Sequence, residues 1–257
     1  MKNYAILGIS YCGSTLLSLL LGKAEKVFSV GEAHWLLQGQ PQCRICTKDC
    51  SFYSKDFLNG LNWNNLTGRI ARRARDKYGC DIVLYSDKNE KFYRQLFNHD
   101  KPDAFILLFK NPKGFVSSYL RHNPTDNPKR RKKYIKEAIR QYEIGYLLNL
   151  KYIEECNSGF IGIYYDDFIL NLPKKMKDIC SFLDIKYSTK LTNLKNLPDK
   201  IHQIGGNFRV NSDFLKKSIR LDDNWKKILT EGEARIIDSS IASEIFTRKL
   251  YPKSKLN

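Results

Sequence analysis

The chain alternates short, largely apolar runs with longer stretches in which apolar residues recur every three or four positions. Apolar runs of about six residues are typical of strands that are buried on both faces of a parallel sheet. The five runs are "YAILGI" (4–9), "KVFSVG" (26–31), "DIVLYS" (81–86), "AFILLF" (104–109) and "GFIGIYY" (159–165). The pattern therefore predicts five strands.

The intervening stretches predict helices over 14–22, 89–98, 112–121, 130–156 and 173–184. Strands that alternate with helices indicate an α/β fold with a mostly parallel central sheet flanked by helices, which binds ligands at the carboxyl ends of its strands. The pattern is less regular beyond about residue 190, and no internal repeat or Gly/Ser-rich linker divides the chain. We expect a single domain over 1–257, with an irregular Cys-containing insertion at about 36–65.

Composition adds a strong positive charge to this picture. Of 257 residues, 42% are hydrophobic, and the formal net charge is +17. Such a charge indicates an anionic partner: nucleic acid, an anionic membrane or a polyanionic cofactor. No apolar stretch approaches the roughly 18 residues that span a bilayer, and the N-terminal stretch lacks a secretory apolar core. We expect a cytoplasmic protein without a membrane partner.

Three of the seven cysteines are clustered in "CRICTKDC", at Cys43, Cys46 and Cys50. Disulfide frameworks are rare in a reducing compartment, so the cluster either packs as small apolar residues or forms a facultative disulfide. A structural zinc site normally has four ligands, and His34 is the nearest candidate for a fourth. With three sulfurs, the sequence favours packing over metal, and we expect no metal.

The segment "GISYCGST" (8–15) has the frame of a phosphate-binding loop, G-x-x-x-x-G-K-[ST], with Ser14 at the lysine position. Gly8 allows a sharp turn off the first strand, and Gly13 allows close approach of the backbone to an anion. The N–H groups of Gly13, Ser14 and Thr15 at a helix N-terminus form an anion cradle. An ordinary strand-to-helix turn with a Ser/Thr N-cap fits the same letters.

A second candidate phosphate site follows the fourth predicted strand. Lys110 ends this strand, and Ser118 lies about two helical turns further on, in "NPKGFVSS". Pro112 suits the first position of a helix, where its missing N–H has no consequence. A cation and a hydroxyl placed in this way can bind one phosphate. Lys110 also fits a solvated lysine at a strand end.

A basic run extends beyond this site. It holds Lys110, Lys113, Arg121, Lys129, Arg130, Arg131, Lys132, Lys133, Lys136 and Arg140, against Asp126 and Glu137. Such a run can bind nucleic acid through its phosphates, but it has no stacking aromatic array and no recognisable nucleic-acid module. We favour a solvated face, or a field that steers an anionic cofactor, and expect no nucleic-acid partner.

Several segments resemble sulfotransferases that use 3′-phosphoadenosine-5′-phosphosulfate (PAPS), in particular the bacterial small-molecule and tyrosylprotein branch. They are "GISYCGSTLLSLLLG…VFSVGEAHWL", "LYSDKNEKFYRQLF", "LLFKNPKGFVSSYLRH", "HQIGGNFRV" and "IRLDDNW", and "CRICTKDCSFY" has counterparts in bacterial members. They occur in the family's order from about residue 4 to about residue 230. No single segment is specific, but their common order and spacing are.

The resemblance implies a fold like that of phosphate-binding-loop nucleotide-binding proteins, with PAPS as donor and adenosine 3′,5′-bisphosphate (PAP) as product, and it requires no metal. The loop residues implied to take the phosphosulfate end are Tyr11, Cys12, Gly13, Ser14, Thr15 and Leu16. Lys110, where family members usually carry Arg, and Ser118 are implied to hold the 3′-phosphate. Asn207 and Arg209 are implied to close over the nucleotide, within a loop at about 200–212.

The resemblance also assigns catalytic roles. Glu32, just past the second strand, matches the general base of the tyrosylprotein branch, and we expect partial burial to raise its pKa. His34 is the rival base. Tyr11 stands where the family carries Lys or Arg, so Lys88, which matches the lysine of the family's "DSSK" segment, is the candidate cation in its place. Glu32 also fits an N-cap, and Lys88 an exposed lysine at a helix start.

The sequence thus predicts transfer of a sulfuryl group to a hydroxyl or nitrogen of a small-molecule acceptor, for example in secondary metabolism. One alternative is a kinase of small metabolites, which would need Mg²⁺ ligands and the loop lysine that Ser14 replaces. The other is an inactive, nucleic-acid-binding relative of the fold. The acceptor and the oligomeric state stay open.

Overall fold

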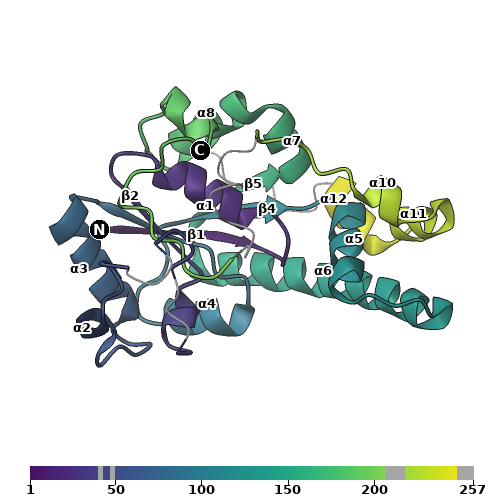
Figure 1. Ribbon diagram of the computed structural model, residues 1–257, viewed down its shortest axis with the longest axis horizontal. Helices are drawn as coiled ribbons and strands as arrows, with labels where there is room; N and C mark the ends of the chain where they lie inside the picture. The colour runs from purple at the N-terminus through teal and green to yellow at the C-terminus, as the bar shows by residue number, and fades with distance from the viewer. Residues whose placement is uncertain (40–42, 47–49, 207–217, 248–257) are drawn as a thin grey trace.

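The computed structural model describes residues 1–39, 43–46, 50–206 and 218–247, and its centre is a five-stranded sheet (Figure 1). The strands are β1 (Lys2–Gly8), β2 (Val27–Gly31), β3 (Ile82–Tyr85), β4 (Ala104–Phe109) and β5 (Gly159–Tyr164). Their order is β2-β3-β1-β4-β5, and every neighbouring pair is parallel. The five predicted strands and the α/β fold class are confirmed.

The apolar sequences of the strands agree with their burial, since nearly all of the strands are covered on both faces. Every residue of β2, β3 and β4 is buried, and in β1 only Lys2 is exposed. The edge strand β5 is half-buried along most of its length. A continuous apolar run is what burial on both faces of a parallel sheet requires.

Helices cover both faces of the sheet (Figure 1). They include α1 (Ser14–Gly22), α7 (Tyr165–Leu170) and α8 (Leu172–Phe182) on one face, and α4 (Glu90–Leu96) and α6 (Pro128–Cys156) on the other. α1 has the predicted range of 14–22. The other four predicted helices correspond to α4, α5 (Pro112–His122), α6 and α8, and their ends lie within two residues of the predicted ones. No described helix has both the length and the apolar character needed to cross a bilayer.

Helix α3 (Leu66–Tyr78) packs against β3 and was missed by the sequence analysis. Its apolar face consists of Leu66, Ile70 and Ala74, spaced by four residues, within an otherwise strongly basic segment. η1 (Ala33–Leu36) leads into the insertion before α3, and the insertion contains α2 (Lys55–Leu58). In the sequence, the narrow apolar stripe of α3 is hard to distinguish from a solvated charged run.

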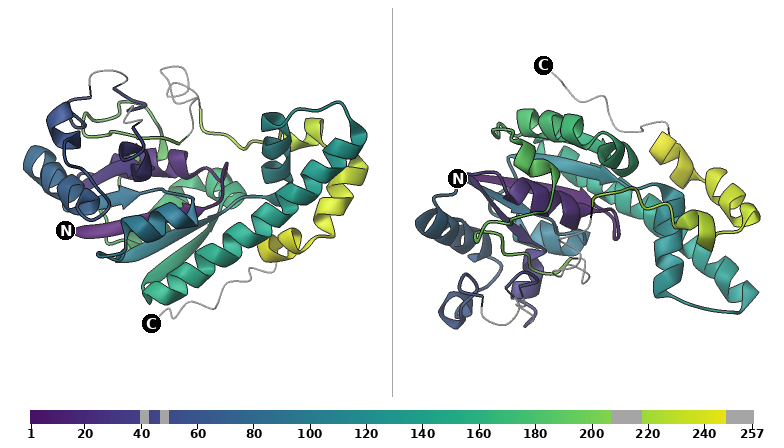
Figure 2. Two further views of the ribbon diagram at one scale, coloured as in Figure 1. Left: turned by 90° about the horizontal axis from the view of Figure 1, so that it is seen from below. Right: turned by 45° about the horizontal axis from the view of Figure 1, so that its top comes forward.

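The C-terminal part is more regular than predicted. After η2 (Thr189–Thr192), it forms α10 (Trp225–Ile228), α11 (Glu231–Asp238) and α12 (Ile241–Thr247). Figure 2 shows these helices gathered beside α5 and α6. Arg131 of α6 pairs with Glu233 at 2.6 Å, and Lys113 of α5 pairs with Asp238 at 3.0 Å. Two cations of the basic run therefore hold α11.

The sheet topology brings four chain segments to one edge. The loop after β1, Glu32 after β2, Lys88 after β3 and Lys110 after β4 all follow the carboxyl ends of neighbouring parallel strands. Ligands of open α/β sheets bind at this edge.

Candidate active site

A cavity of about 700 Å³ opens at the carboxyl edge of the sheet. The predicted site residues that line it are Tyr11, Gly13, Ser14, Thr15, Leu16, Glu32, His34, Lys88, Lys110 and Ser118. The fold thus brings together side chains that are up to about a hundred residues apart in the sequence. Asn207 and Arg209 lie outside the described residues.

The loop after β1 turns into helix α1 through two residues with left-handed backbone. Gly13 has φ +96°, and a Cβ atom there would lie 2.1 Å from Cε2 of Tyr165. The glycine is therefore required by both its dihedral angle and the close approach of the ring. Tyr11 has φ +63°, which is uncommon for a bulky residue. Its ring, 38% exposed, stacks on His122 with the centroids 4.6 Å apart.

The N-terminus of α1 carries no side-chain cap. Gly13 occupies the N-cap position, so the N-cap residue has no side chain to accept a hydrogen bond from the first N–H groups of the helix. Ser14 is 1% exposed, and its Oγ has no oxygen or nitrogen partner within the described ranges; the Cys12 thiol, which both its Oγ and its N–H approach, is only a weak acceptor. Buried hydroxyls and helical N–H groups are normally satisfied, so this arrangement is suited to an anion.

Cys12 does not face the cavity, although the resemblance places it among the nucleotide-binding residues. Its side chain is fully buried, and its N–H donates to the carbonyl oxygen of Ile9 at 3.2 Å. Burial raises the pKa of its thiol. Cys12 supports the turn of the loop and offers neither its sulfur nor its N–H to a ligand.

Glu32 and Lys88 form an ion pair at the cavity wall. Nζ of Lys88 contacts Oε1 of Glu32, and Nε1 of Trp35 donates to Oε2 at 3.0 Å. Burial by itself raises the pKa of Glu32, but the charge and hydrogen bond of Lys88 and the Trp35 bond outweigh it, and the pKa lies below its usual value. The expectation of a raised pKa was wrong, because a buried carboxylate with a cationic partner stays ionised.

Asp87 anchors the segment that carries Glu32. Its two carboxylate oxygens accept hydrogen bonds from the N–H groups of Ala33, at 3.0 Å, and His34, at 3.2 Å. The same carboxylate contacts Nδ1 of His34 at 2.5 Å, and the His34 ring stacks on Phe92. The sequence analysis missed this role of Asp87, although its place beside Lys88 at the end of β3 was a usable signal.

The position of His34 also corrects an earlier expectation. It is fixed by Asp87 in the cavity wall, so it is not the fourth member of the cysteine cluster. Nδ1 of His34 faces Asp87, so the other ring nitrogen, Nε2, is directed away from Asp87. An imidazole oriented in this way by a carboxylate is a common arrangement for a general base.

Lys110 is buried at the other side of the cavity. It is 5% exposed. Burial lowers the pKa of Lys110, and the negative charges of Asp222 and Asp166 act in the opposite direction without cancelling this effect. Its backbone is fixed by Tyr142 and Tyr146 of α6, which bond its carbonyl oxygen at 2.7 Å and its N–H at 2.9 Å. A lysine held this rigidly is not the solvated strand-end lysine of the alternative interpretation.

Ser118 lies one helix further along this wall. Its Oγ donates to the carbonyl oxygen of Gly114 at 2.9 Å and accepts from Nη2 of Arg121 at 3.1 Å. Arg121 and Arg220 also line the cavity, and Arg121 lies 3.9 Å from Asp222. The sequence analysis placed Arg121 only in the general basic run. Its spacing of three from Ser118 puts both on one helical face.

The chain crosses the cavity wall just before residue 207. Ile204 accepts a hydrogen bond from the N–H of Glu32 at 2.8 Å and donates to the carbonyl oxygen of Val30 at 2.7 Å. A Cβ atom on Gly206, which has φ +76°, would lie 2.7 Å from Oγ1 of Thr15. The segment therefore lies against both Glu32 and the loop after β1.

No protein-family model and no curated protein sequence matches the chain. Among solved structures, the chain is similar to the sulfotransferase domain from the Synechococcus PCC 7002 olefin synthase, with a TM-score of 0.60 and 16% identity over 96% of each chain. It is also similar to the sulfotransferase domain from the curacin biosynthetic pathway, with a TM-score of 0.57 and 15% identity over 93% of this chain and 97% of that one. A third is mouse sulfotransferase SULT7A1 complexed with PAP, with a TM-score of 0.52 and 13% identity over 96% of this chain and 84% of that one. The chain has the fold of the sulfotransferases, as its motifs predict.

Proposed function

We propose that the chain is a sulfotransferase that moves the sulfuryl group of PAPS to a hydroxyl or nitrogen of a small-molecule acceptor. The observation that carries the proposal is the uncapped N-terminus of α1, where the buried hydroxyl of Ser14 has no oxygen or nitrogen partner in the described part of the chain. It faces the same cavity as Lys88 and Lys110. The PAP complex of the mouse sulfotransferase supports the choice of donor.

Two groups of side chains suit the two charged ends of such a donor. The N–H groups and hydroxyls of Ser14 and Thr15 would bind the 5′-phosphosulfate end, where the helix dipole favours negative charge. Lys110, Ser118 and Arg121 would bind the 3′-phosphate, because a buried ammonium, a hydroxyl and a guanidinium together form charge-assisted bonds to a dianion.

In the transfer step, the acceptor atom forms a bond to sulfur while the bond between sulfur and the bridging phosphate oxygen breaks. The acceptor proton passes to a base, and PAP leaves with the added negative charge. Lys88 would stabilise that charge, which Tyr11 cannot do by ionic attraction. When the donor binds, Lys88 would leave Glu32 and pair with the phosphate. Until then, the ion pair keeps both side chains charged.

Glu32 is the proposed base, since its carboxylate is ionised and lines the cavity. His34, oriented by Asp87, is the rival. The kinase alternative is disfavoured by Ser14 at the loop-lysine position. The nucleic-acid alternative is weakened because Arg131 and Lys113 of the basic run pair with acidic residues of α11.

The test is calorimetry with PAP at low salt, followed by labelled PAPS with a mixture of acceptors. We expect binding of PAP, much weaker binding of adenosine 5′-monophosphate, and a product whose mass rises by one sulfonate group. Absence of heat with PAP, or Mg²⁺-dependent binding of ATP in its place, would overturn the proposal.

A further inference from the structure

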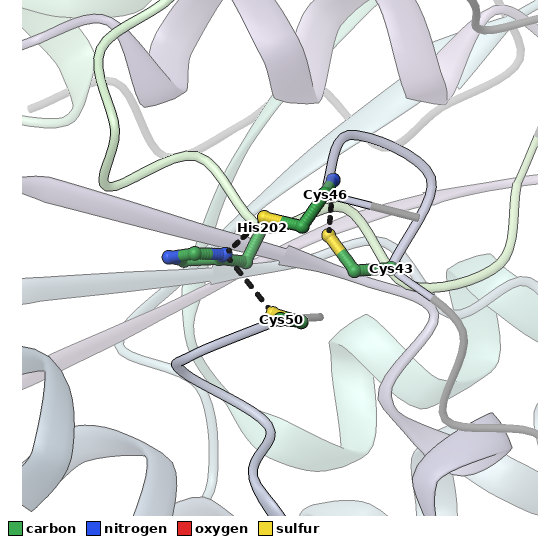
Figure 3. Close-up of side chains that lie close together, drawn as sticks. All are labelled: Cys43, Cys46, Cys50 and His202. Carbon is green, nitrogen blue, oxygen red and sulfur yellow. Dashed lines mark hydrogen bonds between the residues drawn. The ribbon is translucent and has the colours of Figure 1, made fainter. Parts of the chain in front are cut away.

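Three cysteines and one histidine converge outside the cavity (Figure 3). They are Cys43, Cys46, Cys50 and His202, and their ligand atoms all lie within 4.8 Å of one another. Cys43, Cys50 and His202 are buried, and Cys46 is partly buried. The fold brings His202 to the cysteines from about 150 residues further along the chain, which is why no sequence spacing reveals it.

The distances within the cluster suit tetrahedral coordination. Nδ1 of His202 lies 3.3 Å from Sγ of Cys46 and 3.3 Å from Sγ of Cys50. Neighbouring ligand atoms around a tetrahedral zinc ion lie about 3.5–3.8 Å apart, given Zn–S and Zn–N bonds of about 2.3 and 2.0–2.1 Å. The two distances to His202 are a few tenths of an ångström shorter than this, and all four ligand atoms lie within 4.8 Å of one another, so adjustment of the side chains by about an ångström would admit the ion.

The surroundings orient the histidine for this task. The Tyr78 hydroxyl lies 2.7 Å from Nε2 of His202. The His202 ring stacks on the Phe52 ring, with their centroids 5.2 Å apart. A hydrogen bond to the far ring nitrogen fixes the tautomer of metal-binding histidines. The N–H of Cys46 also donates to Sγ of Cys43 at 3.4 Å, which stabilises a thiolate there.

We propose that Cys43, Cys46, Cys50 and His202 bind one structural zinc ion. Three thiolates and an imidazole form a closed four-ligand set, which leaves no position for water or substrate. The expectation of no metal rested on a count of three sulfurs, with His34 as the nearest candidate for a fourth ligand; the structure brings His202, and not His34, to the cysteines. A disulfide would use two of the cysteines and give no role to the oriented histidine.

The ion would tie the cysteine insertion to the wall of the active site. The N–H of Arg44 donates to the carbonyl oxygen of Gln203 at 2.7 Å, and Ile204 is hydrogen-bonded to Glu32. His202 is two residues before Ile204, so zinc at the cluster would fix the backbone that holds the proposed base. The site is structural, and its effect on turnover is indirect.

The test uses the full chain, expressed in zinc-containing medium and purified under reducing conditions without chelators. Elemental mass spectrometry should find about one zinc per chain, and fewer than a tenth as many in Cys50→Ser and His202→Ala. Cys180→Ser, a buried cysteine of α8, is the matched control and should retain the metal.

A second measurement, on the unaltered protein, keeps the proposal testable if the variants fail to fold. Replacing zinc with Co²⁺ in the unaltered protein should produce the visible bands of tetrahedral cobalt and the near-ultraviolet bands of thiolate-to-cobalt charge transfer. A chelator should lower the thermal midpoint of the zinc-loaded protein. Purified protein without bound metal, an octahedral cobalt spectrum, or a disulfide between two of the three cysteines would overturn the proposal.

Discussion

At the scale of single residues, the central feature of the cavity wall is the ion pair of Glu32 and Lys88. Sequence reasoning identified both residues and their opposite charges, but it could not show that each is the other's partner. The pairing depends on the parallel contact of β2 with β3, which places the residues after both strands side by side. The lowered pKa of Glu32 therefore follows from the topology of the sheet.

Glu32→Gln is expected to reduce turnover by about 10²–10⁴-fold, the usual contribution of a general base. The affinity for PAP should not fall and is expected to rise, because loss of the Glu32 carboxylate frees Lys88 for the phosphate. Steady-state kinetics and calorimetry measure the two effects separately. His34→Gln is the matched variant: unchanged turnover in Glu32→Gln with loss in His34→Gln would assign the base to His34.

The pH dependence distinguishes the same two bases. Because Lys88 and Trp35 hold the pKa of Glu32 below its usual value, the acid limb of kcat/KM should lie below about 4.5, the ordinary pKa of Glu. The stability that the pair contributes is complete above that ordinary pKa and is lost as the pH falls through the lowered one. An acid limb well above 4.5 would contradict a Glu32 base.

At the scale of elements, helix α1 presents an N-terminus that no described side chain caps. The apolar run over 14–22 predicted this helix, but the buried hydroxyl of Ser14 without an oxygen or nitrogen partner could only be seen in the structure. Helix α3 and the C-terminal helices were not predicted for different reasons. In α3 charge obscures three apolar positions, and α11 depends on a capping box between Thr230 and Glu233 and on its distant partner Arg131.

Ser14→Ala should act in opposite directions on stability and on binding. The free protein should be at least as stable, because a buried hydroxyl without an oxygen or nitrogen partner is removed. PAP should bind about tenfold to a hundredfold more weakly, since a hydrogen bond to a charged group is worth about 1.5–3 kcal/mol. Thermal unfolding and calorimetry report the two effects.

Ser18→Ala is the control on the same helix. The Ser18 hydroxyl is buried and lies 2.6 Å from that of Ser29, so its loss leaves a partner unsatisfied. This variant should lower the thermal midpoint and leave PAP affinity unchanged. Equal effects of both variants on PAP affinity would show that α1 as a whole, and not its N-terminus, was perturbed.

At the scale of the whole molecule, the excess of positive charge has two uses in the structure. Some of it is structural, as in the pairs Arg131–Glu233 and Lys113–Asp238. Some is exposed, as at Lys132 and Lys133 of α6. A net charge of +17 should raise the local concentration of an anionic donor and accelerate its binding.

Replacing Lys132 and Lys133 with Glu should slow PAP association by about tenfold at low salt, because the steering field is weakened. The dissociation rate should not change, and the difference should disappear at high salt. Stopped-flow binding measures both rates. Lys174→Glu with Lys177→Glu on α8 is the control at equal net charge, and an equal effect there would attribute the slowing to net charge alone.

The hydrogen bonds of Ile204 have a consequence for solubility. β2 is one of the two outer strands of the sheet, and its apolar residues Val27, Phe28 and Val30 are buried. Ile204 pairs with the backbone at the end of this strand and so closes part of an exposed sheet edge. An open apolar edge is a template for strand addition by another chain. Release of this short segment would therefore expose the molecule to edge-to-edge aggregation before its core unfolds.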